Sequence, residues 1–287
     1  MAKSAPSRFL PLHWIGEARD ALTSILIPAP CRLCGEQLNH SSRIPICNSC
    51  LDSFPHVPDK LCAVCGIPMP DIAESPGEQM KCSACRLETY AFDRARSFAI
   101  YEEAVVRAIV MLKFERIEPL AKWFAERLAE IYSASAEQFS ADVVVPVPLH
   151  REREKERGYN QAELLSKPVA KMLGLPHRGV LLMRTKPRPQ KLVLTLRERW
   201  TAVRGAFEIR PGSQVDNLRV LLLDDVMTTG ATLDACSKAL RDAGAKSVVA
   251  LTVARAAHDP LPAAVESLPK GKRHERDTAG YAESQGA

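Results

Sequence analysis

The stretch VLLLDDVMTTGAT at residues 220–232 is the most informative pattern in the chain. Its apolar run ends in two adjacent carboxylates, Asp224 and Asp225, which are followed by hydroxyl residues and a glycine. A helical pattern at residues 233–243 follows at once and is closed by Gly244. A buried strand, a polar turn and a helix in this order are typical of a parallel α/β unit. Such sheets bind ligands at the carboxyl edge of their strands.

The same alternation extends along most of the chain. We expect strands at residues 94–101, 142–147, 219–223 and 247–253, and helices at 102–114, 119–134, 161–173 and 233–243. The run DVVVPV at 142–147 favours a strand that is buried on both faces. Pro168 should bend or interrupt the helix that contains it. The pattern predicts an α/β domain at residues 91–256, with a mostly parallel sheet flanked by helices.

The turn after the two acids has the composition of a phosphate-binding loop. Backbone N–H groups at a helix start bind anions, and the hydroxyls of Thr228, Thr229 and Thr232 would add further donors. Gly230 would let the backbone approach a ligand closely, and the acids would accept hydrogen bonds from ribose hydroxyls. The chain has no GxxxxGK[ST] and no GxGxxG, which argues against Walker and dinucleotide loops. The alternative is a turn that merely caps a helix.

Eight of the nine cysteines form four CxxC pairs before residue 86. They are Cys31/Cys34, Cys47/Cys50, Cys62/Cys65 and Cys82/Cys85. Each CxxC turn supplies two thiolates, so two turns complete a tetrahedral zinc site. The intervening segments of 12 and 16 residues suit two strands and a turn, and Gly35 and Gly66 should adopt positive φ. Two structural zinc sites are expected within residues 31–90, and disulfides or redox-active pairs are the alternative.

The two ends of the chain lack the pattern of the α/β domain. We expect an amphipathic helix at 14–26 within an N-terminal leader, residues 1–30, and a flexible tail at 257–287. No secretory signal and no run of about 18 apolar residues is visible, so we expect a cytoplasmic protein without a membrane span. The net charge of +5 permits contact with phosphates or nucleic acid and does not require it.

The acid pair and its loop resemble the phosphoribosyl-diphosphate signature of type I phosphoribosyltransferases. Other segments narrow the resemblance to the ComF (ComFC-like) family, which joins a double zinc ribbon to such a domain. These segments are the four CxxC pairs, LKF at 112–114, VPVPLHRERE at 145–154, RGYNQA at 157–162, RTKPRPQ at 184–190 and GAF at 205–207. The resemblance covers about residues 31–255. It implies a type I phosphoribosyltransferase-like fold preceded by a small double zinc ribbon.

The resemblance also implies roles for single residues. Asp224 and Asp225 match the ribose-binding acids and are candidate catalytic residues. The 5-phosphate loop is matched by Thr228, Thr229, Gly230, Ala231 and Thr232. The loop that holds diphosphate with Mg²⁺ is matched by Pro148, Leu149, His150 and Arg151. The RGxNQ motif of the family is matched by Arg157, Asn160 and Gln161. Ala202 stands where the family often has asparagine, whereas Arg199 is retained.

A basic segment, residues 184–199, resembles by its position the mobile loop that closes over the diphosphate. Its basic residues, set against the single acid Glu198, are Arg184, Lys186, Arg188, Lys191, Arg197 and Arg199. Arg188 is the third candidate catalytic residue, because a leaving diphosphate needs nearby positive charge. A solvated basic loop is the alternative. The run at 151–157 alternates in charge and should form an exposed helix.

The first functional hypothesis is binding of phosphoribosyl diphosphate with Mg²⁺ and phosphoribosyl transfer to an acceptor that the sequence does not identify. ComF relatives are associated with natural competence. The second hypothesis is therefore a non-catalytic adaptor of DNA uptake, which keeps the ligand pocket and contacts single-stranded DNA or competence proteins such as a helicase. Aromatic residues make up only 6% of the chain, so few are available to stack on DNA bases.

Overall fold

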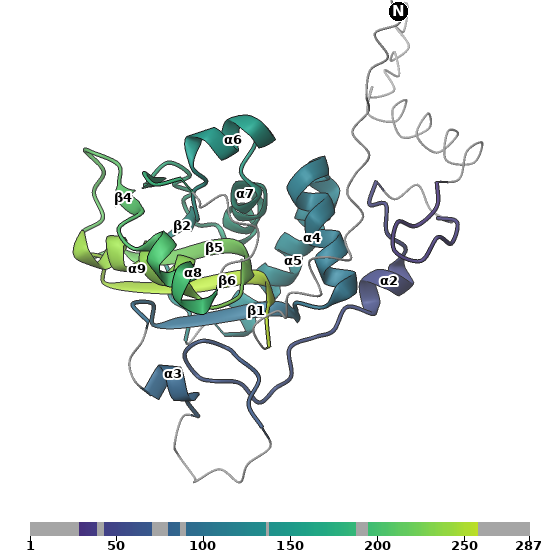
Figure 1. Ribbon diagram of the computed structural model, residues 1–287, viewed down its shortest axis with the longest axis horizontal. Coiled ribbons are helices and arrows are strands. Elements are labelled where there is room, and N and C mark those ends of the chain that lie inside the picture. The colour runs from purple at the N-terminus through teal and green to yellow at the C-terminus, as the bar shows by residue number, and fades with distance from the viewer. Residues whose placement is uncertain are drawn as a thin grey trace, which may run out of the picture.

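The computed structural model describes residues 29–38, 43–70, 80–86, 90–135, 138–187 and 195–257, without the side chains of 196 and 197. The expected helix at 14–26, the tail beyond residue 257, and Arg188 lie outside these residues. A four-stranded parallel sheet forms the centre of the described part (Figure 1). Its strands, in spatial order, are β1 (Arg94–Ile100), β6 (Ser247–Arg255), β5 (Arg219–Met227) and β2 (Val143–Pro146).

Helices cover both faces of this sheet (Figure 1). One face contacts α4 (Glu103–Glu115), α5 (Glu118–Ala134) and α7 (Gln161–Leu173), and the other contacts α9 (Ala231–Asp242), on which α8 (Leu196–Val203) packs. A short helix, α6 (Arg151–Arg157), precedes α7, and its residues are exposed except for the half-buried Arg157. The predicted parallel sheet with flanking helices is therefore confirmed, as is the charged helix at 151–157.

Alternating side chains of the strands build a core on each face. Leu221 and Leu223 of β5 pack toward α5 and α7, whereas Val220 and Leu222 pack toward α9. Successive side chains of a strand point to opposite faces. All four are fully buried, which explains why the strand is a continuous apolar run.

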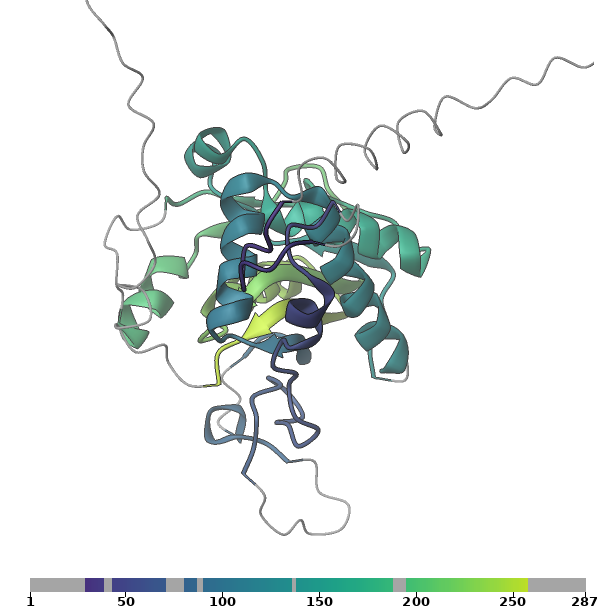
Figure 2. The same ribbon diagram turned by 90° about the vertical axis from the view of Figure 1, so that its right-hand side faces the viewer.

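The cysteine module is divided between the two faces. We call residues 30–54 the first ribbon and residues 61–86 the second ribbon. The first ribbon carries α2 (Asn48–Asp52) and packs on α4 and α5 (Figure 2). The rings of Phe54 and Trp123 meet edge to face there, with centroids 5.8 Å apart. The second ribbon carries α3 (Ser83–Arg86) and joins the core on the opposite face, beside Ala95 of β1 and Phe92 just before that strand.

The ribbons differ in detail from the expected two strands and a turn. In the described residues each first CxxC turn is flanked by a single antiparallel bridge, Pro30–Gln37 and Leu61–Pro68. Each second CxxC pair instead lies at the start of a short helix, α2 or α3. Metal ligation can replace most of the ladder, since the thiolates themselves close the loop. Gly35 and Gly66 have φ of +82° and +65°, as predicted.

In the α/β domain one strand end was predicted wrongly, and a hairpin and a helix were missed. β5 runs on to Met227, so the two acids lie inside the strand and not after it. The antiparallel hairpin of β3 (Leu182–Arg184) and β4 (Phe207–Ile209) was not predicted, and neither was α8. Helix α7 continues through Pro168, so of the expected bend or interruption the interruption does not occur. No helix among the described residues combines the length and apolar character needed to cross a membrane.

Candidate functional site

The two acids are buried near the carboxyl end of β5. Asp224 and Asp225 are 8% and 4% exposed. Lys113, near the end of α4, forms an ion pair with Oδ2 of Asp225, and Nε2 of Gln161 donates a hydrogen bond to Oδ1 at 3.3 Å. The backbone N–H of Asp225 donates to Oδ1 of Asp224 at 2.9 Å. Groups from α4 and α7 therefore converge on a single carboxylate, which holds it in one orientation.

The surroundings push the pKa values of the two carboxyl groups apart. Burial opposes ionisation of Asp225, but the charge of Lys113 and the hydrogen bonds from Asp224, Lys113 and Gln161 together outweigh it, so the pKa of Asp225 lies below its ordinary value. Burial, followed by the charge on Asp225, raises the pKa of Asp224 well above its ordinary value. Adjacent buried carboxylates do not both ionise easily without an added cation. A ligand that brings Mg²⁺ would supply such a cation.

The RGYNQ segment organises this corner of the domain. Asn160 caps α7, since its Oδ1 accepts from the N–H of Ala162 and its Nδ2 donates to the carbonyl of Val147, both at 3.0 Å. Arg157 donates a hydrogen bond to Oε1 of Gln161. The hydroxyl of Tyr159 donates to the carbonyl of Leu112 at 2.8 Å. The segment thus fixes both Gln161 and the end of α4, where Lys113 lies.

The proposed 5-phosphate loop leads directly into α9. Gly230 has φ of +79°, and α9 begins at the next residue, two residues earlier than predicted. The hydroxyl of Thr229 accepts a hydrogen bond from the N–H of Ala231 at 3.3 Å. A small recess is lined by residues 226–233. The threonines, the glycine and the helix start predicted from the sequence therefore surround one recess.

The segment that follows the second ribbon contacts this loop, which no sequence pattern indicated. The hydroxyl of Tyr90 donates to the carbonyl of Thr229 at 2.9 Å, and the N–H of Ala91 donates to Oδ1 of Asp234 at 2.7 Å. The Tyr90 ring stacks on Phe92 and Trp200, with centroids 4.7 and 5.9 Å apart. The ribbon is thereby attached to the turn that would hold the phosphate.

The proposed diphosphate loop lies between β2 and α6. Leu149 and His150 are half-buried, Arg151 is exposed at the first position of α6, and His150 pairs with Arg184 in a parallel bridge. Nδ1 of His150 is buried and has no hydrogen-bond partner among the described residues. The guanidinium of Arg184 lies over the ring of Phe207, with its carbon 5.3 Å from the centroid. The structure therefore brings the start of the basic segment to the proposed diphosphate loop.

The remainder of the basic segment is only partly described. Arg188 and Lys191 lie outside the described residues, as does the Arg197 side chain. Helix α8 begins with a capping box in which Thr195 and Glu198 exchange hydrogen bonds. Arg199 and Ala202 are half-buried on that helix.

The eight CxxC cysteines form two four-sulfur clusters, Cys31/34/47/50 and Cys62/65/82/85, with all Sγ atoms within 4.8 Å of one another. Tetrahedral zinc with Zn–S bonds of 2.3 Å places its sulfurs about 3.8 Å apart. The Sγ–Sγ distances of 3.9 Å (Cys31–Cys50), 3.7 Å (Cys34–Cys47) and 3.6 Å (Cys65–Cys82) match this spacing. The donor sets therefore fit two zinc ions.

Neighbouring groups complete each zinc site differently. Backbone N–H groups of Cys47 and Cys82 donate to the sulfurs of Cys31 and Cys62, both at 3.3 Å, as thiolates require. In the second site, Nη2 of the buried Arg255 lies 3.5 Å from Sγ of Cys65. In the first site, Cys34 is exposed. Neither cluster includes a histidine; His56 is exposed, and His40 lies outside the described residues.

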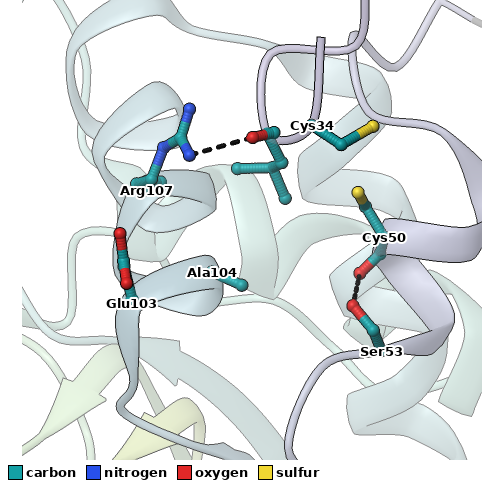
Figure 3. A pocket seen from close by; sticks show the side chains of 7 residues that line it. Cys34, Cys50, Ser53, Glu103, Ala104 and Arg107 are labelled. Carbon is teal, nitrogen blue, oxygen red and sulfur yellow. Dashed lines mark hydrogen bonds between the residues drawn. The ribbon is translucent and has the colours of Figure 1, made fainter. Parts of the chain in front are cut away.

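A cavity of about 270 Å³ lies away from the acids, between the first ribbon and α4 (Figure 3). Nη1 of Arg107 donates to the carbonyl of Leu33 at 3.0 Å across this cavity, and Ser53 donates to the carbonyl of Cys50 at 2.9 Å. Arg32 of the same ribbon pairs with Glu115 at the end of α4. These contacts attach the first ribbon to α4 and leave the acid pair untouched.

Two domain families match separate parts of the chain. The double zinc ribbon domain matches residues 22–86, and the phosphoribosyl transferase domain matches residues 165–266. The chain thus contains one segment similar to a double zinc ribbon and, after it, one similar to a phosphoribosyl transferase domain. This organisation, together with the relatives described next, confirms the predicted resemblance to the ComF family.

Relatives resemble the chain over most of their length. Competence protein F of Haemophilus influenzae is 27% identical over 228 residues, which cover 76% of this chain and 93% of the relative. Competence protein ComFC of Bacillus subtilis is 28% identical over 221 residues, covering 73% and 84%. DNA utilization protein YhgH of Escherichia coli K12 is 26% identical over 231 residues, covering 78% and 96%.

Solved structures give a more distant likeness. The glutamine phosphoribosylpyrophosphate amidotransferase of B. subtilis, complexed with ADP and GMP, aligns with 47% of this chain and 26% of its own, at 23% identity and a TM-score of 0.33. This likeness is too small to carry an argument about the ligand of the present chain.

Proposed function

We propose that the chain binds phosphoribosyl diphosphate with Mg²⁺ at the carboxyl edge of its sheet. The convergence of Lys113 and Gln161 on Asp225, beside the glycine turn that opens α9, is the observation that carries this proposal. A buried acid pair held in one orientation suits the two hydroxyls of a ribose, and the helix start suits its 5-phosphate. The match to the phosphoribosyl transferase domain supports the same ligand.

Each part of the site has a role in this proposal. Asp224 and Asp225 bind the ribose, and residues 228–232 bind the 5-phosphate. Residues 149–151 hold the diphosphate, and Mg²⁺, when bound, neutralises its charge. In the transfer, an acceptor lone pair forms a bond to ribose C1 while the C1–oxygen bond breaks, and its electron pair leaves with the diphosphate. Arg188 is proposed to stabilise that leaving group.

Calorimetry with phosphoribosyl diphosphate and Mg²⁺ tests the binding. We expect the wild type to bind and the double variant Asp224→Asn/Asp225→Asn to lose most of the affinity. Glu130→Gln, at an exposed position of α5, serves as a control that removes a carboxylate outside the site. Failure of the folded wild type to bind would refute the proposal. Release of diphosphate with one of a panel of free bases would establish the transfer reaction.

A second candidate function is an adaptor in DNA uptake, which the names of the relatives favour. In this case the ligand pocket is kept for binding, and the ribbons or the basic segment contact single-stranded DNA or a competence protein. Anisotropy of a labelled oligonucleotide, measured over a range of salt, tests DNA contact, because phosphate contacts weaken as salt rises. Ligand binding without diphosphate release, together with DNA binding, would favour the adaptor over the enzyme.

A further inference from the structure

The two four-sulfur clusters differ in the exposure of their cysteines. In the second ribbon three of the four are at most 3% exposed, namely Cys62, Cys65 and Cys85. In the first ribbon Cys31 alone is buried, and Cys34 is exposed. Oxidation of a thiolate depends on whether the oxidant can reach it. The two zinc sites therefore differ in chemical accessibility, although their ligand sets are identical.

The second cluster is shielded by the core and by a buried cation. Cys65 and Cys85 belong to the same core cluster as Phe92. The buried guanidinium of Arg255 lies 3.5 Å from Sγ of Cys65. A positive charge beside a thiolate stabilises its negative charge, which makes the sulfur a weaker nucleophile. Burial and charge thus protect the second cluster from the same reaction.

The first cluster instead opens on the cavity of about 270 Å³ between the first ribbon and α4 (Figure 3). Cys34 and Cys50 lie on the ribbon side of this cavity, opposite Glu103 and Arg107 of α4. A water molecule occupies about 30 Å³ in the liquid. Hydrogen peroxide has only one oxygen atom more, so the cavity is large enough to admit it. Small oxidants therefore have a route to two of the four sulfurs.

We propose that the first ribbon is a peroxide-sensitive zinc site in which Cys34 is oxidised first. The thiolate of Cys34 attacks one oxygen of hydrogen peroxide, so that an S–O bond forms, the O–O bond breaks and hydroxide leaves. The thiolate of Cys47, whose Sγ lies 3.7 Å away, then attacks the sulfur of this sulfenic acid. The S–S bond forms, the S–O bond breaks and a second hydroxide leaves. Two thiolates have then lost two electrons to the peroxide, and the zinc ion, left with two ligands, dissociates.

Oxidation of the first ribbon should also loosen α4. The carbonyl of Leu33, in the first CxxC turn, accepts a hydrogen bond from Nη1 of Arg107 at 3.0 Å. Arg32 of the same turn pairs with Glu115 near the end of the helix. A turn that loses its metal loses the bonds that hold its shape, so both contacts with α4 weaken. Since Lys113 lies on the same helix, the change extends to its ion pair with the buried acids.

The test uses the full-length protein loaded with two zinc ions and treated with hydrogen peroxide in stepwise equivalents. Zinc release is followed with a chromogenic chelator, and the cysteines are mapped by alkylation and mass spectrometry. Ala104→Leu narrows the cavity, because Ala104 lines it, and Ala134→Leu, at the exposed end of α5, is the matched control. Hydrogen exchange of α4 and α9 is measured before and after treatment, so that loosening of α4 is distinguished from global unfolding.

We expect the zinc ion of the first ribbon to leave about tenfold faster than that of the second. Cys34 should be found in the disulfide while the second ribbon is still reduced, and exchange should rise in α4 and not in α9. Ala104→Leu should slow the first release, and Ala134→Leu should not. The inference is overturned if both ribbons lose zinc together, or if Cys34 is still reduced when the first ion has left. Unchanged release in Ala104→Leu would overturn the cavity as the route of the peroxide.

Discussion

The hydroxyl of Tyr90 lies 2.9 Å from the carbonyl oxygen of Thr229 and donates a hydrogen bond to it. Tyr90 follows the last cysteine of the second ribbon by five residues, whereas Thr229 lies in the middle of the proposed phosphate loop. This single contact spans 139 residues of sequence. It makes the shape of the loop depend on a segment outside the sheet.

Replacement of Tyr90 by phenylalanine should destabilise the protein by about 1 kcal/mol, because the Thr229 carbonyl loses its donor while the ring still stacks on Phe92. Binding of phosphoribosyl diphosphate should weaken as the loop loosens. Tyr132→Phe is the control, since it also removes a hydroxyl that bonds to backbone, at the N–H of Ala141, but far from the loop. Urea unfolding and calorimetry measure the two effects. Equal ligand affinity in both variants would contradict this account.

Gly230→Ala should abolish ligand binding. It should also lower the free energy of unfolding by more than the strain of a positive φ alone would. A Cβ at Gly230 would lie 2.7 Å from Cε1 of Tyr90 and 2.8 Å from Cε of Met227. Gly212→Ala separates the two causes, because Gly212 has a nearly identical φ of +80° and no atom within 4 Å of an added Cβ. That control should cost about 1 kcal/mol in thermal or urea unfolding. A similar loss in both variants would show that crowding at the loop is unimportant.

Lys113→Met should destabilise the protein by roughly 3 kcal/mol at neutral pH, because it leaves the Asp225 carboxylate buried and unpaired. Adding Asp225→Asn should recover most of this loss. Lys122→Met, at an exposed lysine of α5, should change the stability by less than about 0.5 kcal/mol. Urea unfolding of the four proteins gives the comparison. A Lys113→Met variant as stable as the control would show that the ion pair is unimportant.

The Lys113→Met defect should also depend on pH. In the wild type the pKa of Asp225 is lowered, so its contribution to stability is complete above the ordinary carboxyl range and is lost as pH falls through the lowered pKa. In the variant, burial without the ammonium raises this pKa instead. The stability deficit should therefore be largest at neutral pH and shrink toward about pH 4. A deficit that is constant over this range would contradict the assignment of Lys113 as the counter-charge.

The purified protein should contain about two zinc ions per chain. A single cysteine substitution in either ribbon should lower the zinc content to about one ion per chain. Cys65→Ser should lower the melting temperature more than Cys34→Ser, because Cys65 is buried against Arg255 whereas Cys34 is exposed. Its loss leaves a buried guanidinium without its thiolate partner. Colorimetric zinc release and thermal unfolding measure these quantities. Equal melting temperatures would show that the second ribbon is independent of the sheet.

The sheet could be predicted from the sequence because its evidence is local. Continuous apolar runs such as 142–147 and 219–223 predict strands without knowledge of their neighbours, because both faces of a parallel sheet are covered. The cysteine spacing likewise predicted both four-sulfur clusters. The strand end was misplaced, because Asp224 and Asp225 are polar and look like a turn until Lys113 and Gln161 satisfy them from elsewhere.

The rest of the site depends on contacts between distant segments. Nothing in the local sequence around Tyr90 indicates a phosphate loop, and nothing around Lys113 indicates an acid 112 residues away. The hairpin of β3 and β4 was missed for a related reason, because each strand has only three residues and no strong alternation. The LKF and RGYNQ segments were noticed only through the family resemblance, and their contacts supply the physical reason for both motifs.

The contact of Arg255 with Cys65 relates the completion of the second ribbon to the order of synthesis. Synthesis delivers the cysteines of that ribbon early, at residues 62–85, but the guanidinium that lies against Cys65 belongs to the last residue of β6. During translation the ribosome must therefore complete nearly the whole α/β domain before this thiolate cluster acquires its buried counter-charge. Until then, Sγ of Cys65 lacks the contact with this guanidinium. A ribbon that precedes the α/β domain in sequence is thus among the last parts of the protein to reach its final surroundings.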